Sequence, residues 1–276
     1  MLNVINRGKK EAEVKIISSL KIIFNNGSLK SLVPELKILS AKNIFLITGK
    51  SSAEKSGLLK RVKQLLNDYN ITVFNNIFLN PTVNEMERCL DASRKSRADV
   101  VIGLGGGSVM DVAKVVSVFS KNQEDVIGFV EKKNNIPENK IPCITIPTLA
   151  GTGAEITPFA VIYHKHKKYS LDNPVVQPEI SIIDPDLSMD APVEASFYSA
   201  FDALSQAIEA FWAIKSTKES DEYAKEAITL LPKVMEKLLF DPKSLEVRTE
   251  LSRGSLLAGK AIAITRTTAP HALAYP

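Results

Sequence analysis

Apolar positions recur along the first two thirds of the chain with two different periods. Short apolar runs rich in β-branched residues, with glycine, proline or asparagine at or near their ends, lie at residues 41–48, 71–74, 76–78, 98–102 and 142–147. Segments with apolar residues every three or four positions separate them, at residues 53–69, 84–97 and 112–119. Alternating strands and helices predict an α/β fold with a doubly wound parallel sheet.

The pattern changes near residue 186. The segments 161–163 and 180–184 flank a polar stretch and predict a hairpin or an excursion from the sheet. No strand pattern follows. Three long helices are predicted, over 194–214, 219–239 and 244–264. Pro232 should kink or break the second of them. We therefore predict an α/β domain over 1–185 and an all-helical domain over 186–276. Because residues 272–276 are apolar rather than polar, we expect a truncated chain whose helical domain continues.

Composition and charge argue against nucleic-acid and membrane partners. The chain of 276 residues is 45% hydrophobic and carries a net charge of +4 with its basic residues dispersed, so we expect no nucleic-acid partner. No signal peptide and no apolar stretch long enough to span a bilayer is apparent. The two distant cysteines, Cys89 and Cys143, suit a reduced protein. We expect a cytoplasmic protein with no membrane association.

A run of glycines between a predicted strand and a predicted helix is the strongest functional signal. Gly105, Gly106 and Gly107 let the backbone approach a ligand closely, and the free N–H groups at the start of the helix favour a phosphate group. Ser108 can cap the helix, with Asp111 completing a variant capping box. The spacing is neither G-x-G-x-x-G nor a P-loop. The alternative is a tight turn that binds nothing.

A second loop of small residues follows the strand at 142–147. Three threonines and two glycines lie in residues 146–158, where hydroxyls and amides suit phosphate or ribose oxygens. The alternative is a loop with local Ser/Thr turns.

Polar residues form a stripe on the first long helix of the second domain. Asp202, Gln206 and Glu209 share one helical face, which points to a cleft, a partner helix or solvent. His271 lies further on, and a lone histidine is usually a core or surface residue. His164 and His166 stand in a lysine-rich stretch that we interpret as a solvated hairpin tip.

The two loops resemble the iron-containing (group III) alcohol dehydrogenase family. One family motif is GGGS followed by an aspartate and a lysine, and residues 105–108 with Asp111 and Lys114 match it. A second family motif is IPTxAGTGSE, which residues 146–155 match except that Ala154 replaces the usual serine. Lys168 resembles a family lysine near the cofactor. The resemblance, which extends from about residue 24 to Pro276, implies NAD or NADP binding by the first domain.

The later motifs of the resemblance imply a metal site with altered ligands. Asp202 and His271 match two family ligands of a divalent ion, iron or zinc, whereas Gln206 stands where a histidine is expected. An amide oxygen binds such ions more weakly than imidazole does. Tyr275 stands where many members have a second histidine, and a fourth ligand would lie beyond Pro276.

By this resemblance the reaction is hydride transfer between nicotinamide and a small alcohol or aldehyde, with the metal polarising the carbonyl. His271 and Tyr275 are the catalytic candidates, and Asp202, Gln206 and His271 the metal ligands. We expect the cofactor at Gly105, Gly106, Gly107, Ser108, Asp111, Thr148, Thr152, Thr157, Lys168 and Lys50.

Four points remain open: the choice of cofactor, the substrate, the class of function and self-association. Lys50 follows the first predicted strand without a nearby carboxylate, which favours NADP over NAD. The string TTAPH at residues 267–271, together with Gln206 and Tyr275, resembles the phosphonoacetaldehyde reductases. Arg266 could pair with a phosphonate group, and the alternative is an ordinary surface arginine. The alternatives are a decayed nucleotide-binding paralogue without catalysis and a glycerol- or sugar-phosphate-type dehydrogenase or cyclase. Self-association is also open.

Overall fold

A mostly parallel β-sheet forms the centre of the α/β region. The computed structural model of the chain describes residues 13–17, 20–131 and 135–274, with side chains from residue 20 onward. Within these residues a seven-stranded sheet has the order β1-β2-β9-β6-β5-β3-β4, in which only β1 runs antiparallel to its neighbour. The strands are β1 (Glu13–Ile17), β2 (Leu20–Phe24), β3 (Asn43–Gly49), β4 (Asn70–Ile77), β5 (Val100–Gly105), β6 (Cys143–Pro147) and β9 (Ile180–Ile183).

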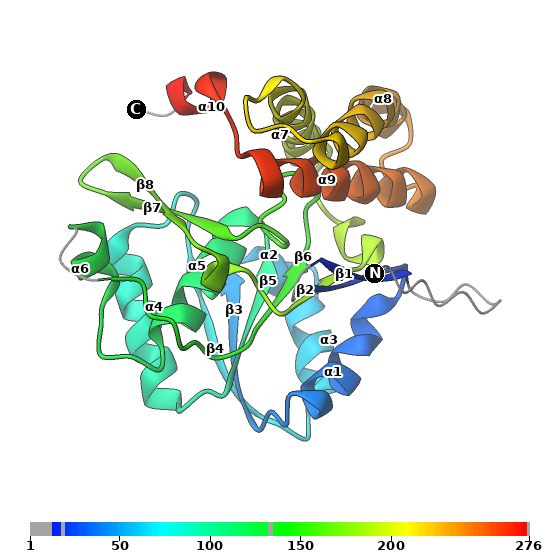
Figure 1. Cartoon of the computed structure of the whole chain (residues 1–276). Coiled ribbons are helices and arrows are strands. Elements are labelled where there is room, and N and C mark those ends of the chain that lie inside the picture. The colour runs from blue at the N-terminus through cyan, green and yellow to red at the C-terminus, as the bar shows by residue number, and fades with distance from the viewer. Residues whose placement is uncertain (1–12, 18–19, 132–134, 275–276) are drawn as a thin grey trace.

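Helices cover both faces of this sheet, as Figure 1 shows, with α1 and α3 on one side and α4 and α5 on the other. Along β3, Phe45 and Ile47 enter one apolar cluster while Ile44 and Leu46 enter the other, because successive side chains point to opposite faces. Burial on both faces explains the continuous apolar runs in the sequence. The helices are α1 (Leu32–Ile38), α2 (Ser52–Lys55), α3 (Leu58–Leu65), α4 (Val83–Ser96), α5 (Gly107–Phe119) and α6 (Val126–Val130).

The direction in which the chain builds the sheet reverses between β3 and β5. From β3 the chain moves outward to β4, then returns to β5 on the other side of β3 and continues to β6 and β9. Open α/β sheets bind ligands at the carboxyl ends of the strands beside such a reversal. The glycine loop follows β5 at this position.

The doubly wound parallel sheet predicted from the sequence is therefore confirmed, with differences in detail. The helix predicted over 53–69 is divided into α2 and α3, because Gly57 adopts a φ of +74° between them. Residues 161–163 and 180–184 do not form the hairpin that was one of the two expectations, because β7 (Phe159–His164) pairs with β8 (Lys167–Asp172) and β9 joins the main sheet. The β7–β8 hairpin is instead an excursion from the main sheet. The sequence pattern did not predict β1, β2, α1 or the short α10 (Ala269–Leu273).

The region after β9 is helical, as expected. Its long helices α7 (Val193–Trp212), α8 (Lys218–Phe240) and α9 (Leu245–Thr265) lie above the carboxyl end of the sheet (Figure 1). Pro232 was expected to kink or break the second of these helices, and it does not break it, since α8 continues through it. Leu231 and Val234 are fully buried in the cluster that the three helices share, and this packing compensates for the lost hydrogen bond. None of the helices in the described residues is long and apolar enough to cross a membrane.

Candidate active site

The glycine loop leaves an open space at the start of α5. A Cβ atom on Gly105 would lie 2.8 Å from Val109 Cγ2, and one on Gly107 would lie 2.8 Å from Thr152 Oγ1. At Gly106 an added Cβ would have no neighbour within 4 Å. Gly105 and Gly107 are thus required by packing, whereas Gly106 borders free space beside the amides of a helix of 13 residues.

The predicted capping box at α5 is wrong. Gly106 occupies the N-cap position, no side chain caps the helix, and Ser108 lies within its first turn. Asp111 Oδ2 instead accepts a hydrogen bond of 3.0 Å from the Val161 backbone N–H. Because a glycine caps the helix, its first N–H groups are left to a ligand while Asp111 joins α5 to β7.

A buried lysine strengthens this junction. Lys114 is fully buried, and its Nζ lies 3.0 Å from Asp111 Oδ1. The same ammonium donates to the carbonyl of Phe159 and to Thr157 Oγ1 at 3.4 Å. A buried charge is tolerated only when it is paired in this way. Lys114 therefore helps to hold the β7–β8 hairpin against the glycine helix.

A cleft of about 170 Å³ opens between the glycine loop, the hairpin and the helical region. The residues predicted from the sequence that line it are Gly107, Ser108, Asp111, Thr152, Thr157, Lys168, Asp202, Gln206 and His271. Segments separated by more than a hundred residues in sequence therefore meet at one site.

The remaining predicted residues lie elsewhere. The Thr148 N–H donates to the carbonyl of Gly105 at 3.0 Å, which places it directly beside the glycine loop. Lys50 lies at the carboxyl end of β3, and its Nζ is 4.8 Å from the centre of the Phe78 ring, outside the lining of the cleft. Tyr275 lies outside the described residues.

Three polar side chains gather on the helical side of the cleft. Asp202 Oδ1 lies 3.2 Å from His271 Nε2, and Asp202 Oδ2 accepts a hydrogen bond of 2.8 Å from Gln206 Nε2. Gln206 Nε2 also lies 3.4 Å from the carbonyl of Thr152. Gln206 Oε1 is buried and has no hydrogen-bond partner within the part of the chain that the structure describes. A buried oxygen in this state favours a cation or a donor that enters from the cleft.

Glu209 is a member of this cluster to which sequence reasoning assigned no role. It is 2% exposed, and its carboxylate contacts His271 Nδ1 and accepts hydrogen bonds from Thr268. The hydrogen bond with Asp202, with a further contribution from Glu209, raises the pKa of His271 despite its burial. Burial acts to raise the pKa of Glu209, but its hydrogen bonds with His271 and Thr268 lower it overall. The signal in the sequence was its place on the same helical face as Asp202.

Lys168 supplies positive charge to the opposite wall of the cleft. It belongs to β8 and is partly buried. Burial lowers the pKa of Lys168, and the nearby carboxylates of Asp111 and Asp202 oppose that shift. Lys168 therefore shares the cleft with Asp111 of the glycine helix and with Asp202 of the polar cluster.

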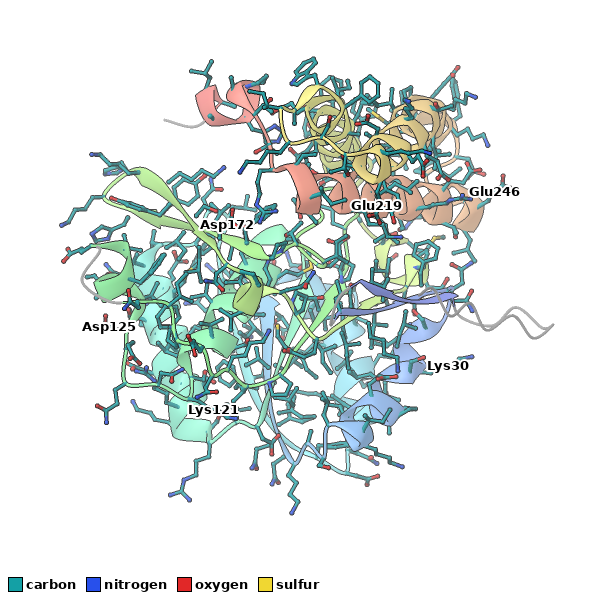
Figure 2. All side chains as sticks on the ribbon, viewed as in Figure 1. Lys30, Lys121, Asp125, Asp172, Glu219 and Glu246 are labelled. Carbon is teal, nitrogen blue, oxygen red and sulfur yellow. The ribbon has the colours of Figure 1, made fainter. Side chains whose placement is uncertain are left out.

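Arg266 does not line the cleft. Its guanidinium binds Asp172 through two hydrogen bonds of 2.7 and 2.8 Å and lies 5.2 Å from the centre of the Phe159 ring. Figure 2 labels Asp172 where the hairpin approaches the end of α9. The suggestion that Arg266 meets a phosphonate is therefore corrected: this arginine joins the hairpin to the helical region.

Two family models match the chain. A family model described as iron-containing alcohol dehydrogenase matches residues 19–185. A second model, described as the C-terminal part of the Fe-containing alcohol dehydrogenase family, matches residues 196–276. The chain belongs to the iron-containing alcohol dehydrogenase family.

Relatives within the family are similar over most of this chain. Long-chain-alcohol dehydrogenase 1 of Geobacillus thermodenitrificans is 31% identical over 91% of this chain and 64% of that protein. Phosphonoacetaldehyde reductase of Streptomyces viridochromogenes is 34% identical over 66% of this chain and 48% of that protein. The structure of sulfoacetaldehyde reductase from Bifidobacterium kashiwanohense in complex with NAD+ has a TM-score of 0.88 and 28% identity, covering 94% of this chain and 69% of that one. The chain thus spans less than two thirds of the length of several curated relatives that it matches.

The family name implies iron, and the polar cluster offers donors for a divalent ion. Asp202 and His271 are strong donors that lie close together, and Gln206 Oε1 is a buried oxygen without a partner among the described residues. No group of three or more His, Cys, Asp or Glu side chains in the described ranges is arranged to hold a metal. A divalent ion at this cluster would therefore have two strong ligands, Asp202 and His271, and one weak amide ligand, Gln206.

Proposed function

We propose that the chain is part of an NAD(P)-dependent alcohol dehydrogenase or aldehyde reductase that transfers hydride between nicotinamide and a small alcohol or aldehyde. One observation carries the proposal: the cleft joins the open space at the glycine helix to the cluster of Asp202, Gln206 and His271. The pyrophosphate of the cofactor would bind the amides at Gly105–Ser108, with Thr148, Thr152 and Thr157 on the neighbouring loop.

The side chains of the cluster act on the substrate oxygen. In aldehyde reduction, hydride passes to the carbonyl carbon, and the carbonyl oxygen gains negative charge and then a proton. When the His271 ring is protonated on both nitrogens, its Nε2–H faces the cleft beside Asp202, so this form suits proton transfer to the substrate oxygen. Tyr275 is the second candidate for the proton. Asp202, Gln206 and His271 would hold a divalent ion, which supplies Lewis acidity toward the same oxygen when it is bound.

We propose phosphonoacetaldehyde as the first aldehyde to test. Similarity to a phosphonoacetaldehyde reductase and to a sulfoacetaldehyde reductase favours an aldehyde that carries an anionic group. Lys168 in the cleft offers the positive charge that such a group needs.

We propose a division into an α/β cofactor domain over 1–185 and a helical metal and substrate domain over 186–276, in keeping with the last strand ending at Ile183. The free, buried thiols of Cys89 and Cys143 suit a cytoplasmic protein.

The test is turnover by the purified chain, and by any longer form, with added iron or zinc. We expect oxidation of NADPH in the presence of phosphonoacetaldehyde, measured by nicotinamide absorbance. Asp202→Ala should abolish this turnover while leaving NADPH binding unchanged, and Glu194→Gln, on the same helix but exposed, is the matched control. Cofactor binding without turnover of any aldehyde or alcohol would instead indicate a decayed nucleotide-binding paralogue.

A further inference from the structure

Within the described residues, the segment that carries His271 has few contacts with the rest of the chain. From Ala269 to Ala274 every residue except His271 is exposed, and the five-residue α10 contains no buried residue. Among the described residues, apolar burial therefore does not fix the position of the segment. Its position depends on polar contacts made by Thr268 and His271, the residues whose contacts reach α7.

A single buried carboxylate provides most of these contacts. Glu209 Oε2 accepts hydrogen bonds from the Thr268 backbone N–H at 2.6 Å and from the Thr268 hydroxyl at 2.8 Å. Glu209 Oε1 contacts His271 Nδ1. Trp212 Nε1 donates to the same hydroxyl at 3.1 Å. One side chain of α7 thus holds both the backbone before α10 and the imidazole ring.

We propose that Glu209 is a positioning residue for His271: it places the segment through Thr268 and keeps the imidazole proton on Nδ1, so that Nε2 presents its lone pair to the cleft beside Asp202. This inference rests on the proposed function, because a lone pair at Nε2 is what a metal ion requires. Glu209 does not itself line the cleft.

Glu209 competes for the imidazole proton with Asp202 on the other side of the ring. The Glu209 side chain is 3% exposed, whereas that of Asp202 is 35% exposed and 3.2 Å from Nε2. Charge-assisted hydrogen bonds are stronger where water is excluded. In the neutral ring, Glu209 therefore retains the proton at Nδ1.

Replacement by glutamine tests this directly, because the amide keeps the shape but has one accepting oxygen. The Thr268 N–H cannot rotate, so the amide oxygen is expected to face it. The NH₂ group then faces His271 Nδ1 and donates to it, which moves the imidazole proton to Nε2. A residue that only anchored the segment would not change the tautomer.

The experiment is side-chain ¹⁵N NMR of the metal-free chain, above the pH at which His271 titrates. The chain has three histidines, so a background of His164→Gln and His166→Gln leaves His271 alone in the spectrum. We expect the Nδ1–H tautomer in this background and the Nε2–H tautomer after Glu209→Gln, with Glu194→Gln as the unchanged control. An Nε2–H ring before the substitution, or the same tautomer after it, would overturn the proposal.

Zinc titration by calorimetry supplies a second readout. Glu209→Gln should weaken binding by about 10- to 100-fold relative to Glu194→Gln, with thermal unfolding used to check that the variant is folded. Equal zinc affinity in folded Glu209→Gln and Glu194→Gln would refute a role of Glu209 in presenting Nε2. Failure of the proposed function has a different signature, namely no aldehyde turnover while the Nδ1–H tautomer is present.

Discussion

A substitution at Gly106 should change the affinity for the cofactor without changing the stability of the fold. Its φ of −83° and ψ of −175° are accessible to any residue, and an added Cβ would meet no atom within 4 Å. In the bound state proposed here, however, that space holds a pyrophosphate at the start of α5. Gly106→Ala and Gly106→Val should therefore disturb the ligand and leave the protein intact.

The expected magnitudes follow from the local geometry. Losing glycine at a helix N-cap costs roughly 0.5–1 kcal/mol, and restricting the unfolded chain returns about 0.4–1 kcal/mol. Stability should thus change by less than about 1 kcal/mol, or roughly 2–4 °C in Tm. Displacing a phosphate oxygen from one amide costs about 1.5–3 kcal/mol, because hydrogen bonds to charged groups have this strength. The Kd for NADPH should rise roughly 10- to 150-fold.

Fluorescence titration with NADPH and thermal unfolding measure the two quantities. Gly105→Ala is the contrasting variant, since its Cβ would lie 2.8 Å from Val109 Cγ2 and 3.0 Å from Val109 Cβ, and such overpacking costs about 1–3 kcal/mol of stability. Unchanged NADPH affinity in a folded Gly106→Val variant would refute the assignment of the loop. Loss of affinity only in parallel with loss of stability would refute the reasoning about free space.

Two further predictions concern charge. Burial raises the pKa of the Glu155 carboxyl from 4.5 to about 7. Between pH 4.5 and 7 the folded state therefore binds one more proton than the unfolded state, so the free energy of unfolding falls as pH rises through this range. Above pH 7 the loss of stability reaches about 3 kcal/mol. Glu155→Gln should remove this loss, which denaturant unfolding at several pH values can measure, and an identical pH profile would contradict it. Lys50→Ala should lower the affinity for NADP relative to NAD by about tenfold, roughly 1.4 kcal/mol, in paired titrations; a tenfold preference of the unmodified chain for NAD would count against NADP.

The fold was predictable where periodicity and burial agree. The strands β3, β5 and β6 are buried on both faces and appear in the sequence as unbroken apolar runs, and α7, α8 and α9 carry long helical patterns. The N-terminal strands were missed because β1 and β2 find their partners at the sheet edge, next to β9 far along the chain. Local pattern contains no information about such pairing.

The site was predictable only in part, because residue type indicates chemistry but not the partner of each side chain. The stripe on α7 placed Asp202, Gln206 and Glu209 on one face, yet the role of Glu209 depends on Thr268, which is 59 residues away. The capping pattern predicted that Asp111 contacts the backbone at the start of its own helix. Its carboxylate instead pairs with Lys114 and accepts a hydrogen bond from Val161 on the hairpin, which the local sequence does not indicate.

Long-range polar contacts join the elements that surround the cleft. Asp111 ties the β7–β8 hairpin to the glycine helix, and Arg266 ties the same hairpin, through Asp172, to the end of α9. Glu209 then holds the segment that follows α9 against α7. Each of these contacts uses a charged group at or beside the cleft, where apolar packing would fill the space that the substrate needs. The cleft can therefore stay open and still keep the glycine loop and His271 in a defined relation, which hydride transfer between a bound cofactor and a bound aldehyde requires.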